Sequence, residues 1–157
     1  MRCILVVASF LCSAAVAADS FVDARLGRWE EVKGVSGDYQ SIRRTYESLG
    51  GGLTRMVVND KLDAIHQWHV DFRCDATRYE ILGHDDRPVG QYLTCRRRGE
   101  RVFEMSLVRT GPWMGKVDIT RVHESVSDDG ERMNVVAFSR RPDGNEKVVY
   151  REFNRIH

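Results

Sequence analysis

Apolar and polar residues alternate in short runs along most of the chain, and Gly, Asp and Asn separate the runs. Between residues 65 and 74, for example, Trp68, Val70, Phe72 and Cys74 occupy alternate positions. That spacing places side chains on one face of a β-strand. Past residue 18, no window of about eleven residues or more repeats apolar positions at helical spacing. The pattern therefore predicts an all-β fold.

Ten segments carry the strand pattern: residues 28–33, 41–48, 53–58, 65–74, 78–82, 89–97, 101–109, 116–125, 132–140 and 147–155. Several joints between them have the composition of tight turns: Gly50-Gly51-Gly52, Arg98-Gly99, Asp128-Asp129-Gly130 and Pro142-Asp143-Gly144-Asn145. Consecutive segments are thus close enough along the chain to form hairpins.

An antiparallel meander is the simplest arrangement of such hairpins. Closing the meander into a barrel removes the two exposed edges that an open sheet would leave. We therefore predict a single antiparallel up-and-down β-barrel of about eight to ten strands over residues 19–157.

The first 18 residues have a different pattern. A basic residue, Arg2, precedes an apolar run over residues 4–11, and small residues follow up to Ala18. This is the order of a secretory signal peptide, and the apolar run is shorter than the roughly 20 residues that span a bilayer. A buried first helix is the alternative, which the absence of charge over residues 3–18 disfavours. We expect cleavage after Ala17 or Ala18, a periplasmic or secreted mature protein, and no transmembrane segment after cleavage.

Composition narrows the class further. The chain has 157 residues, of which 42% are hydrophobic and 30% charged, as in an ordinary single globular domain. Its 24 basic and 23 acidic residues leave a formal net charge of +1. No overall field then favours a polyanion, and we expect no nucleic-acid partner.

Cysteine positions point to a disulfide. Cleavage would remove Cys3 and Cys12 and leave Cys74 and Cys95, and such a pair in an oxidising compartment is most simply bonded. A strict meander places residues 78–82 between them, and two strand spacings of about 4.8 Å exceed the roughly 7 Å Cα limit for a disulfide. The thiols meet only if that short strand begins beyond the barrel rim at which both cysteines end their strands. We expect the disulfide rather than two free buried thiols.

Short motifs carry a family resemblance. Leu26-Gly27-Arg28-Trp29 resembles the Gly-x-Trp opening of lipocalin-type barrels, and Arg44-Thr45-Tyr46-Glu47 precedes a glycine turn. With the later turns at Asp129-Gly130 and Asp143-Gly144, this order is similar to that of exported bacterial lipocalin-like proteins of the calycin type, over nearly all of residues 19–157. The resemblance implies an antiparallel barrel whose internal cavity holds a small, mostly apolar ligand.

Motifs of catalysis or metal binding do not emerge. Gly34-Val35-Ser36-Gly37 lacks the strand-to-helix context of a nucleophile elbow, and Gly50-Gly51-Gly52 lacks the lysine and helix of a phosphate-binding loop. His66 and His69 are three residues apart on one predicted strand and so point to opposite faces. We expect no metal and no cofactor, and no nucleophile with its base supports an enzyme.

Charged residues on faces that otherwise point inward are the main anomaly. Arg44, Arg121 and Glu152 each share an alternating face with apolar neighbours. Because an unpaired buried charge is costly, inward arginines suit a cavity that orients an acidic ligand head. The alternatives are that strand ends turn these side chains to solvent, that an arginine stacks on Trp29 and closes one barrel end, or that Arg44 pairs with Glu152.

A binding protein is the function that these features favour. We expect an exported, non-enzymatic barrel for a small apolar or amphipathic ligand, with Arg44 and Arg121 near an anionic head. Trp68, Phe103 and Met105 would then form the apolar wall.

An envelope interaction domain with a filled barrel is the first alternative, and an enzyme acting on an apolar substrate is the second. The predicted hairpin tip at residues 110–115 contains Trp113 and Met114, which suit contact with a protein partner or a lid over the barrel mouth. An interior void of roughly 300 Å³ or more favours ligand binding over a filled barrel.

Overall fold

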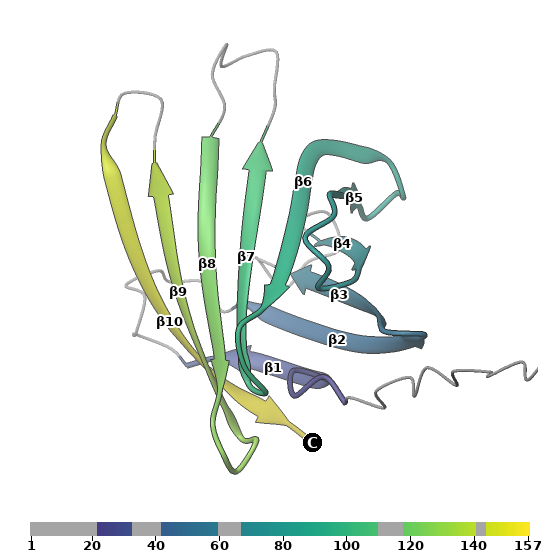
Figure 1. Ribbon diagram of the computed structural model, residues 1–157, viewed down its shortest axis with the longest axis vertical. Helices are drawn as coiled ribbons and strands as arrows, with labels where there is room; N and C mark the ends of the chain where they lie inside the picture. Colours follow the sequence, from purple (N-terminus) through teal and green to yellow (C-terminus); the bar gives the residue numbers. More distant parts are fainter. Residues whose placement is uncertain (1–21, 33–41, 60–66, 110–117, 141–143) are drawn as a thin grey trace, which may run out of the picture.

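The structure, a computed structural model, describes residues 22–32, 42–59, 67–109, 118–140 and 144–157. These ranges contain ten strands that close into one antiparallel barrel, each strand paired with its neighbours in the chain (Figure 1). The strands are β1 (Gly27–Glu31), β2 (Arg43–Gly50), β3 (Leu53–Asn59), β4 (Gln67–Phe72), β5 (Tyr79–Gly83), β6 (Pro88–Arg97), β7 (Val102–Arg109), β8 (Asp118–Val126), β9 (Arg132–Arg140) and β10 (Glu146–Ile156).

Every predicted strand overlaps one of these strands, and the predicted all-β, closed antiparallel barrel is confirmed. The reason is that alternation with a two-residue period identifies a strand, and the turn residues between the runs join consecutive strands into hairpins. Boundaries shift slightly, since β2 continues to Gly50 rather than ending at residue 48 and β10 continues to Ile156.

Some predictions fall on residues that the structure does not describe. The expected signal peptide over residues 1–18, His66, and the expected contact residues Trp113 and Met114 lie outside the described ranges and stay predictions. Among the residues within those ranges, no helix is long and apolar enough to cross a membrane.

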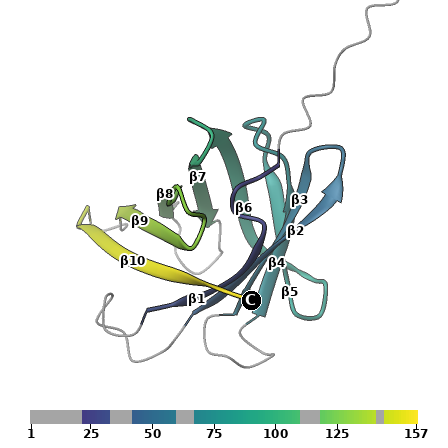
Figure 2. The ribbon, with the colours of Figure 1, turned by 90° about the horizontal axis from the view of Figure 1, so that it is seen from below.

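The strand β1 closes the barrel by pairing on both of its sides. Arg28 lies opposite Ile156 of β10, and Trp29 lies opposite Arg44 of β2. Figure 2 shows β1 running beside both of these strands. Closure therefore joins the earliest described strand to the latest one and leaves no free sheet edge between them.

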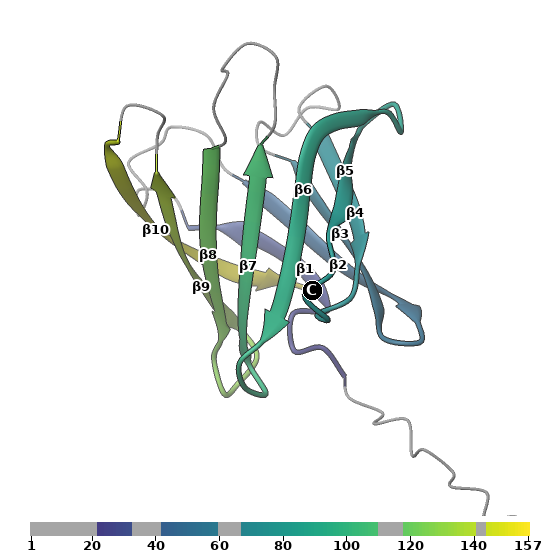
Figure 3. The same ribbon diagram turned by 45° about the horizontal axis from the view of Figure 1, so that its top comes forward.

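The barrel has two different ends (Figure 3). We call the turn end the one at which tight hairpins join β2 to β3, β6 to β7 and β8 to β9, and we call the opposite end the loop end. At the turn end, Gly50, Gly51 and Gly52 have φ angles of 84°, 57° and 75°, a region that other residues rarely adopt. The predicted glycine turn between β2 and β3 is thus confirmed.

The predicted disulfide between Cys74 and Cys95 is present, with their Cα atoms 4.3 Å apart. The intervening strand β5 is short and pairs with β4 over only two residue pairs. Beyond that pairing, Asp75 forms an isolated β-bridge with Arg96. The chain after β4 therefore reaches β6 directly, which brings the two cysteines together.

Removing this crosslink is expected to lower the stability of the barrel. The bond closes a loop with a sequence separation of 21, and in the loop-entropy model such a crosslink stabilises by about 3 kcal/mol. Urea unfolding of the double variant Cys74→Ser, Cys95→Ser should show that loss, and the reduced parent protein should match the variant. Equal stability of the oxidised and reduced parent would contradict the prediction.

Candidate functional site

Inward side chains become less buried from the turn end to the loop end. Along five strands, the inward residues nearer the turn end are buried and the next ones toward the loop end are half-buried. The buried and half-buried members are, in order, Val70 and Trp68 on β4, Met105 and Leu107 on β7, Val122 and Thr120 on β8, Val135 and Ala137 on β9, and Phe153 and Arg151 on β10. Side chains thus fill the turn end, whereas the loop end of the interior is partly open to solvent.

A buried arginine occupies the filled end. Arg25 lies just before β1, and its side chain is fully buried. Its guanidinium carbon lies 3.7 Å from the ring centroid of Phe103, and 5.1 Å and 5.4 Å from those of Tyr46 and Phe72. These cation–π contacts replace part of the hydration that the buried cation has lost.

Two carboxylates neutralise the positive charges at this depth. The side chain of Asp23 accepts hydrogen bonds from Nε and Nη2 of Arg25 at 3.0 and 2.7 Å. Glu124, which is fully buried on β8, accepts from Nη1 of Arg25 at 3.3 Å and from Nη1 of Arg44. The Tyr46 hydroxyl donates to the same carboxylate, with distances of 2.9 and 3.0 Å to its two oxygens.

We call Asp23, Arg25, Arg44, Tyr46 and Glu124 the buried charge cluster. Burial raises the pKa of the Tyr46 hydroxyl above its ordinary value, and the charge of Glu124 raises it further. Burial alone would lower the pKa of Arg25, but the hydrogen bond with Asp23 and the charge of Glu124 outweigh it, so that pKa lies above its ordinary value. The tyrosine is therefore a neutral donor, and the two cations balance the two carboxylates.

The expected pairing of Arg44 with Glu152 is wrong. Arg44 does point inward as predicted, but its carboxylate partner is Glu124. Glu152 lies on β10 in the phase of Tyr150, which is exposed, whereas Phe153 in the other phase is buried. The sequence of β10 has apolar residues at both sets of alternating positions. The side chains that point inward are those in the same set as Phe153.

The predicted inward orientation of Arg121 is also wrong. Its strand has apolar residues in both alternating phases, and the interior takes the phase of Val122 and Val126, which are buried. Arg121 lies in the opposite phase with His123, and both are exposed. Arg121 thus belongs to the outer surface of the barrel.

Trp68, Phe103 and Met105 all face the interior, as predicted, but at different depths. Phe103 and Met105 are buried at the filled end, and both contact Arg25, with 3.7 Å between Nη1 of Arg25 and the Met105 sulfur. Trp68 is half-buried and packs against the core at the loop end. Their role in ligand binding stays a prediction, and only Trp68 borders the partly open part.

An arginine does stack on Trp29, as one alternative proposed, and it is Arg155. Its guanidinium carbon lies 4.3 Å from the Trp29 ring, and it donates to the backbone carbonyl of Gly130 at 2.6 Å. The fully buried Trp29 in turn donates from its indole nitrogen to the carbonyl of Arg25 at 2.7 Å. This stack holds the segment before β1 against the turn end.

Polar groups also occur at the partly open end. The hydroxyls of Thr120 and Ser139 lie 3.0 Å apart across β8 and β9, and Arg151 donates to Glu31 at 2.8 Å. Glu31, which is buried on β1, was not singled out in the sequence analysis. An inward arginine on β10 opposite β1 was the signal that could have found it.

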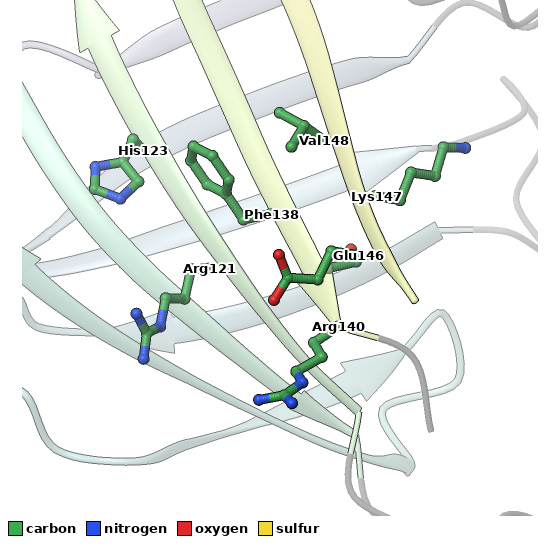
Figure 4. Close-up of a pocket in the computed structure, with 8 residues that line it drawn as sticks. Arg121, His123, Phe138, Arg140, Glu146, Lys147 and Val148 are labelled. Carbon is green, nitrogen blue, oxygen red and sulfur yellow. The ribbon is translucent and has the colours of Figure 1, made fainter. Parts of the chain in front are cut away.

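A second concave site lies on the outside of the barrel. It is a hollow of about 520 Å³ over the outer face of β8, β9 and β10 (Figure 4). Its lining residues are Arg121, His123, Phe138, Ser139, Arg140, Glu146, Lys147 and Val148. In Figure 4, Arg121, Arg140 and Glu146 lie at one end of the hollow and His123, Phe138 and Val148 at the other.

Metal ligands do not gather in the part of the chain that the structure describes, where no group of three or more His, Cys, Asp or Glu side chains is placed to hold an ion. His69 points outward on β4 and lies 3.4 Å from Asp86. That contact is a single pair, and metal sites need three or four converging ligands.

Solved structures share this fold. Echinococcus granulosus fatty-acid-binding protein 1 aligns with a TM-score of 0.61 at 15% identity, over 87% of this chain and 100% of that chain. Zebrafish ileal bile acid-binding protein, in complex with cholic acid, aligns with a TM-score of 0.55 at 11% identity, over 85% of this chain and 99% of that chain. The fluorescent protein UnaG aligns with a TM-score of 0.56 at 14% identity, over 83% of this chain and 96% of that chain.

These similarities agree with the predicted fold class, a closed antiparallel up-and-down barrel. No family model matches the sequence. No curated protein sequence matches it either.

Replacing Glu124 with Gln is expected to destabilise the barrel by about 3 kcal/mol, because it leaves two buried guanidinium groups with one carboxylate. The matched control is Glu104→Gln on β7, whose carboxylate pairs with the half-exposed Arg98 at 2.7 Å. That control should cost less than about 1 kcal/mol. Chemical unfolding of both variants measures the difference, and equal losses would contradict the assigned role of Glu124.

Tyr46 is expected to stay un-ionised in the native protein at pH 11. Its pKa is raised in the folded state, so the neutral hydroxyl stabilises the fold fully below the unfolded pKa of about 10. That contribution is lost as the pH rises above this value toward the folded pKa. Absorbance of phenolate should therefore increase when urea unfolds the protein at pH 11, and Tyr46→Phe should show a smaller increase. An unchanged increase in the variant would contradict the burial argument.

Proposed function

We propose that the protein is an exported carrier that binds a small, largely apolar ligand inside the loop end of its barrel. The observation that carries the proposal is the decrease in burial of inward side chains toward that end. Trp68, Leu107 and Ala137 are apolar, inward-facing and half-buried there. Apolar side chains left partly open in a concave interior are typical of a ligand site.

The similar solved structures support the same ligand class. One is named as a fatty-acid-binding protein and another as a bile acid-binding protein in complex with cholic acid. Since fold alone does not establish function, these names serve as analogy, and the interior of this chain supplies the direct argument.

An acidic head group fits this interior in one position. The side chains of Arg44 and Arg151 are 14% and 18% exposed. They lie nearer the turn end than the hydroxyl pair of Thr120 and Ser139. Each guanidinium already pairs with a carboxylate, Glu124 or Glu31. A ligand carboxylate would share these cations instead of neutralising free ones, so we propose an amphipathic ligand whose charge adds modestly to its affinity.

Export is the second part of the proposal. The residue order over 1–18 supports a cleaved signal peptide. The disulfide between Cys74 and Cys95 is consistent with it, since such bonds persist in oxidising compartments.

Filling the loop end of the interior is expected to block binding. Ala137→Phe adds a ring at a half-buried inward position of β9, whereas Val136→Phe adds the same ring to the outward face. Laurate should change the fluorescence of Trp68 in the parent and in Val136→Phe, and Ala137→Phe should need at least tenfold more laurate.

The Trp68→Phe variant identifies the reporter, because it should lose most of the fluorescence response while still binding laurate by calorimetry. A parent protein without a saturable Trp68 response, or an Ala137→Phe variant that responds like the parent, would contradict the proposal. Either result would favour the filled barrel.

A further inference from the structure

Side chains on the outer face of β8, β9 and β10 form a regular grid. Strand register places Arg121, Phe138 and Val148 in one row across the three strands. The adjacent rows contain His123, Val136 and Tyr150 on one side, and Arg140 with Glu146 on the other. The hollow of about 520 Å³ lies over this grid.

The middle of the grid is unusually apolar for an outer surface. Phe138 is 44% exposed and Val148 is 45% exposed, and they lie opposite each other on β9 and β10. Tyr150, in the next row, is 62% exposed. The ring of His123 contacts Phe138 edge-on, with 5.8 Å between ring centroids. Contiguous exposed apolar side chains in a concave site indicate binding.

Cations flank this apolar centre without carboxylate partners. Two arginines elsewhere on the outer wall pair with a carboxylate of a neighbouring strand: Arg43 with Glu30 at 2.9 Å and Arg55 with Asp71 at 2.6 Å. Within the described ranges, the side chains of Arg121 and Arg140 make no hydrogen bond and no ion pair. Glu146 is the carboxylate that lines the hollow beside them.

The register brings the two arginines close together. Arg121 lies opposite Phe138, and Arg140 is two residues further along β9. Such diagonal neighbours have Cα atoms about 7–8 Å apart, so two guanidinium groups can hold one carboxylate between them.

We propose that this hollow is a second, exterior binding site for a small amphipathic carboxylate. Its acidic head lies between Arg121 and Arg140, and its apolar part covers Phe138 and Val148. Arg121, Arg140, Phe138 and Val148 all lie in the outward phase of their strands, so these contacts stand whether or not the interior binds a ligand. Ser139, which also lines the hollow, lies in the inward phase and takes no part in them.

Size and charge favour a free small molecule over a larger partner. The volume of about 520 Å³ falls in the range of small-molecule sites. An anionic membrane is usually bound by clusters of about four to eight Lys and Arg residues, more than line this hollow. A stable complex with a protein partner buries about 800 Å² on each side. A small molecule can bind in a concave site without so large a contact area.

A laurate titration followed by NMR at constant pH tests the proposal, because each site has its own reporter. The ring protons of His123 report on the exterior hollow, and the indole N–H of Trp68 reports on the interior. We expect the His123 signals to shift with saturation in the parent. Arg121→Gln should weaken that response at least tenfold and leave the Trp68 response unchanged. Arg28→Gln, which removes an exposed arginine of β1 that does not line the hollow, should change neither.

Ala137→Phe separates this site from the interior one, because it should remove the Trp68 response and leave the His123 response. Loss of both responses in that variant would overturn the exterior site, and an unchanged Trp68 response would overturn only the interior proposal.

Dodecanol, which has the same chain length but no carboxylate, should need at least a tenfold higher concentration than laurate to shift the His123 signals. Equal effects would overturn the role of the arginines. The protein could instead sediment with phosphatidylglycerol vesicles in a way that depends on Arg121, and show no saturable laurate binding. That result would overturn the proposal in favour of a membrane-binding surface.

Discussion

The carboxylate of Glu124 is the group on which the filled half of the barrel depends. It is fully buried and binds Arg25 from the segment before β1, and Arg44 and Tyr46 from β2. Each of these side chains would be costly to bury alone, because its charge or hydroxyl would lose its hydration without replacement. Together they form a neutral, hydrogen-bonded unit that joins segments far apart in the sequence. The disulfide and the stack of Arg155 on Trp29 secure the same end of the molecule.

The positive and negative charges of the buried charge cluster balance. This balance limits which ligands the proposed interior site could prefer. A barrel with free inward cations would attract anions strongly, whereas here the deepest charges are already paired within the protein. In the proposed interior site, selectivity would then depend on apolar contact with residues such as Trp68 and Leu107 and on the hydroxyls of Thr120 and Ser139. On β9, successive residues serve different surfaces, with Ala137 lining the interior and Phe138 the outer hollow.

The strands and the closure of the barrel were predictable from the sequence, but the charged site was only partly so. Alternation and turn residues are local signals, and they hold for a segment such as 65–74, where one phase alone is apolar. In β8, Ile119 and Val122 belong to opposite phases, and local periodicity cannot decide between them. The decision comes from partners elsewhere in the chain, since Glu124 is inward only because Arg25, Arg44 and Tyr46 meet it there. Arg25 itself lies before the first strand, where no alternation marks it. The disulfide was predictable because it needed only a cysteine count and a short intervening strand.

The pairing of β1 with β10 has a consequence for the order of folding. Arg28 must find Ile156 before the barrel can close, so the contact spans most of the sequence and forms at a large cost in loop entropy. A chain made from its amino end cannot complete this contact until the last strand is available. The unfinished sheet would meanwhile keep two open edges and an unsealed apolar face. Such a chain stays unfolded for longer than one whose contacts are mostly local.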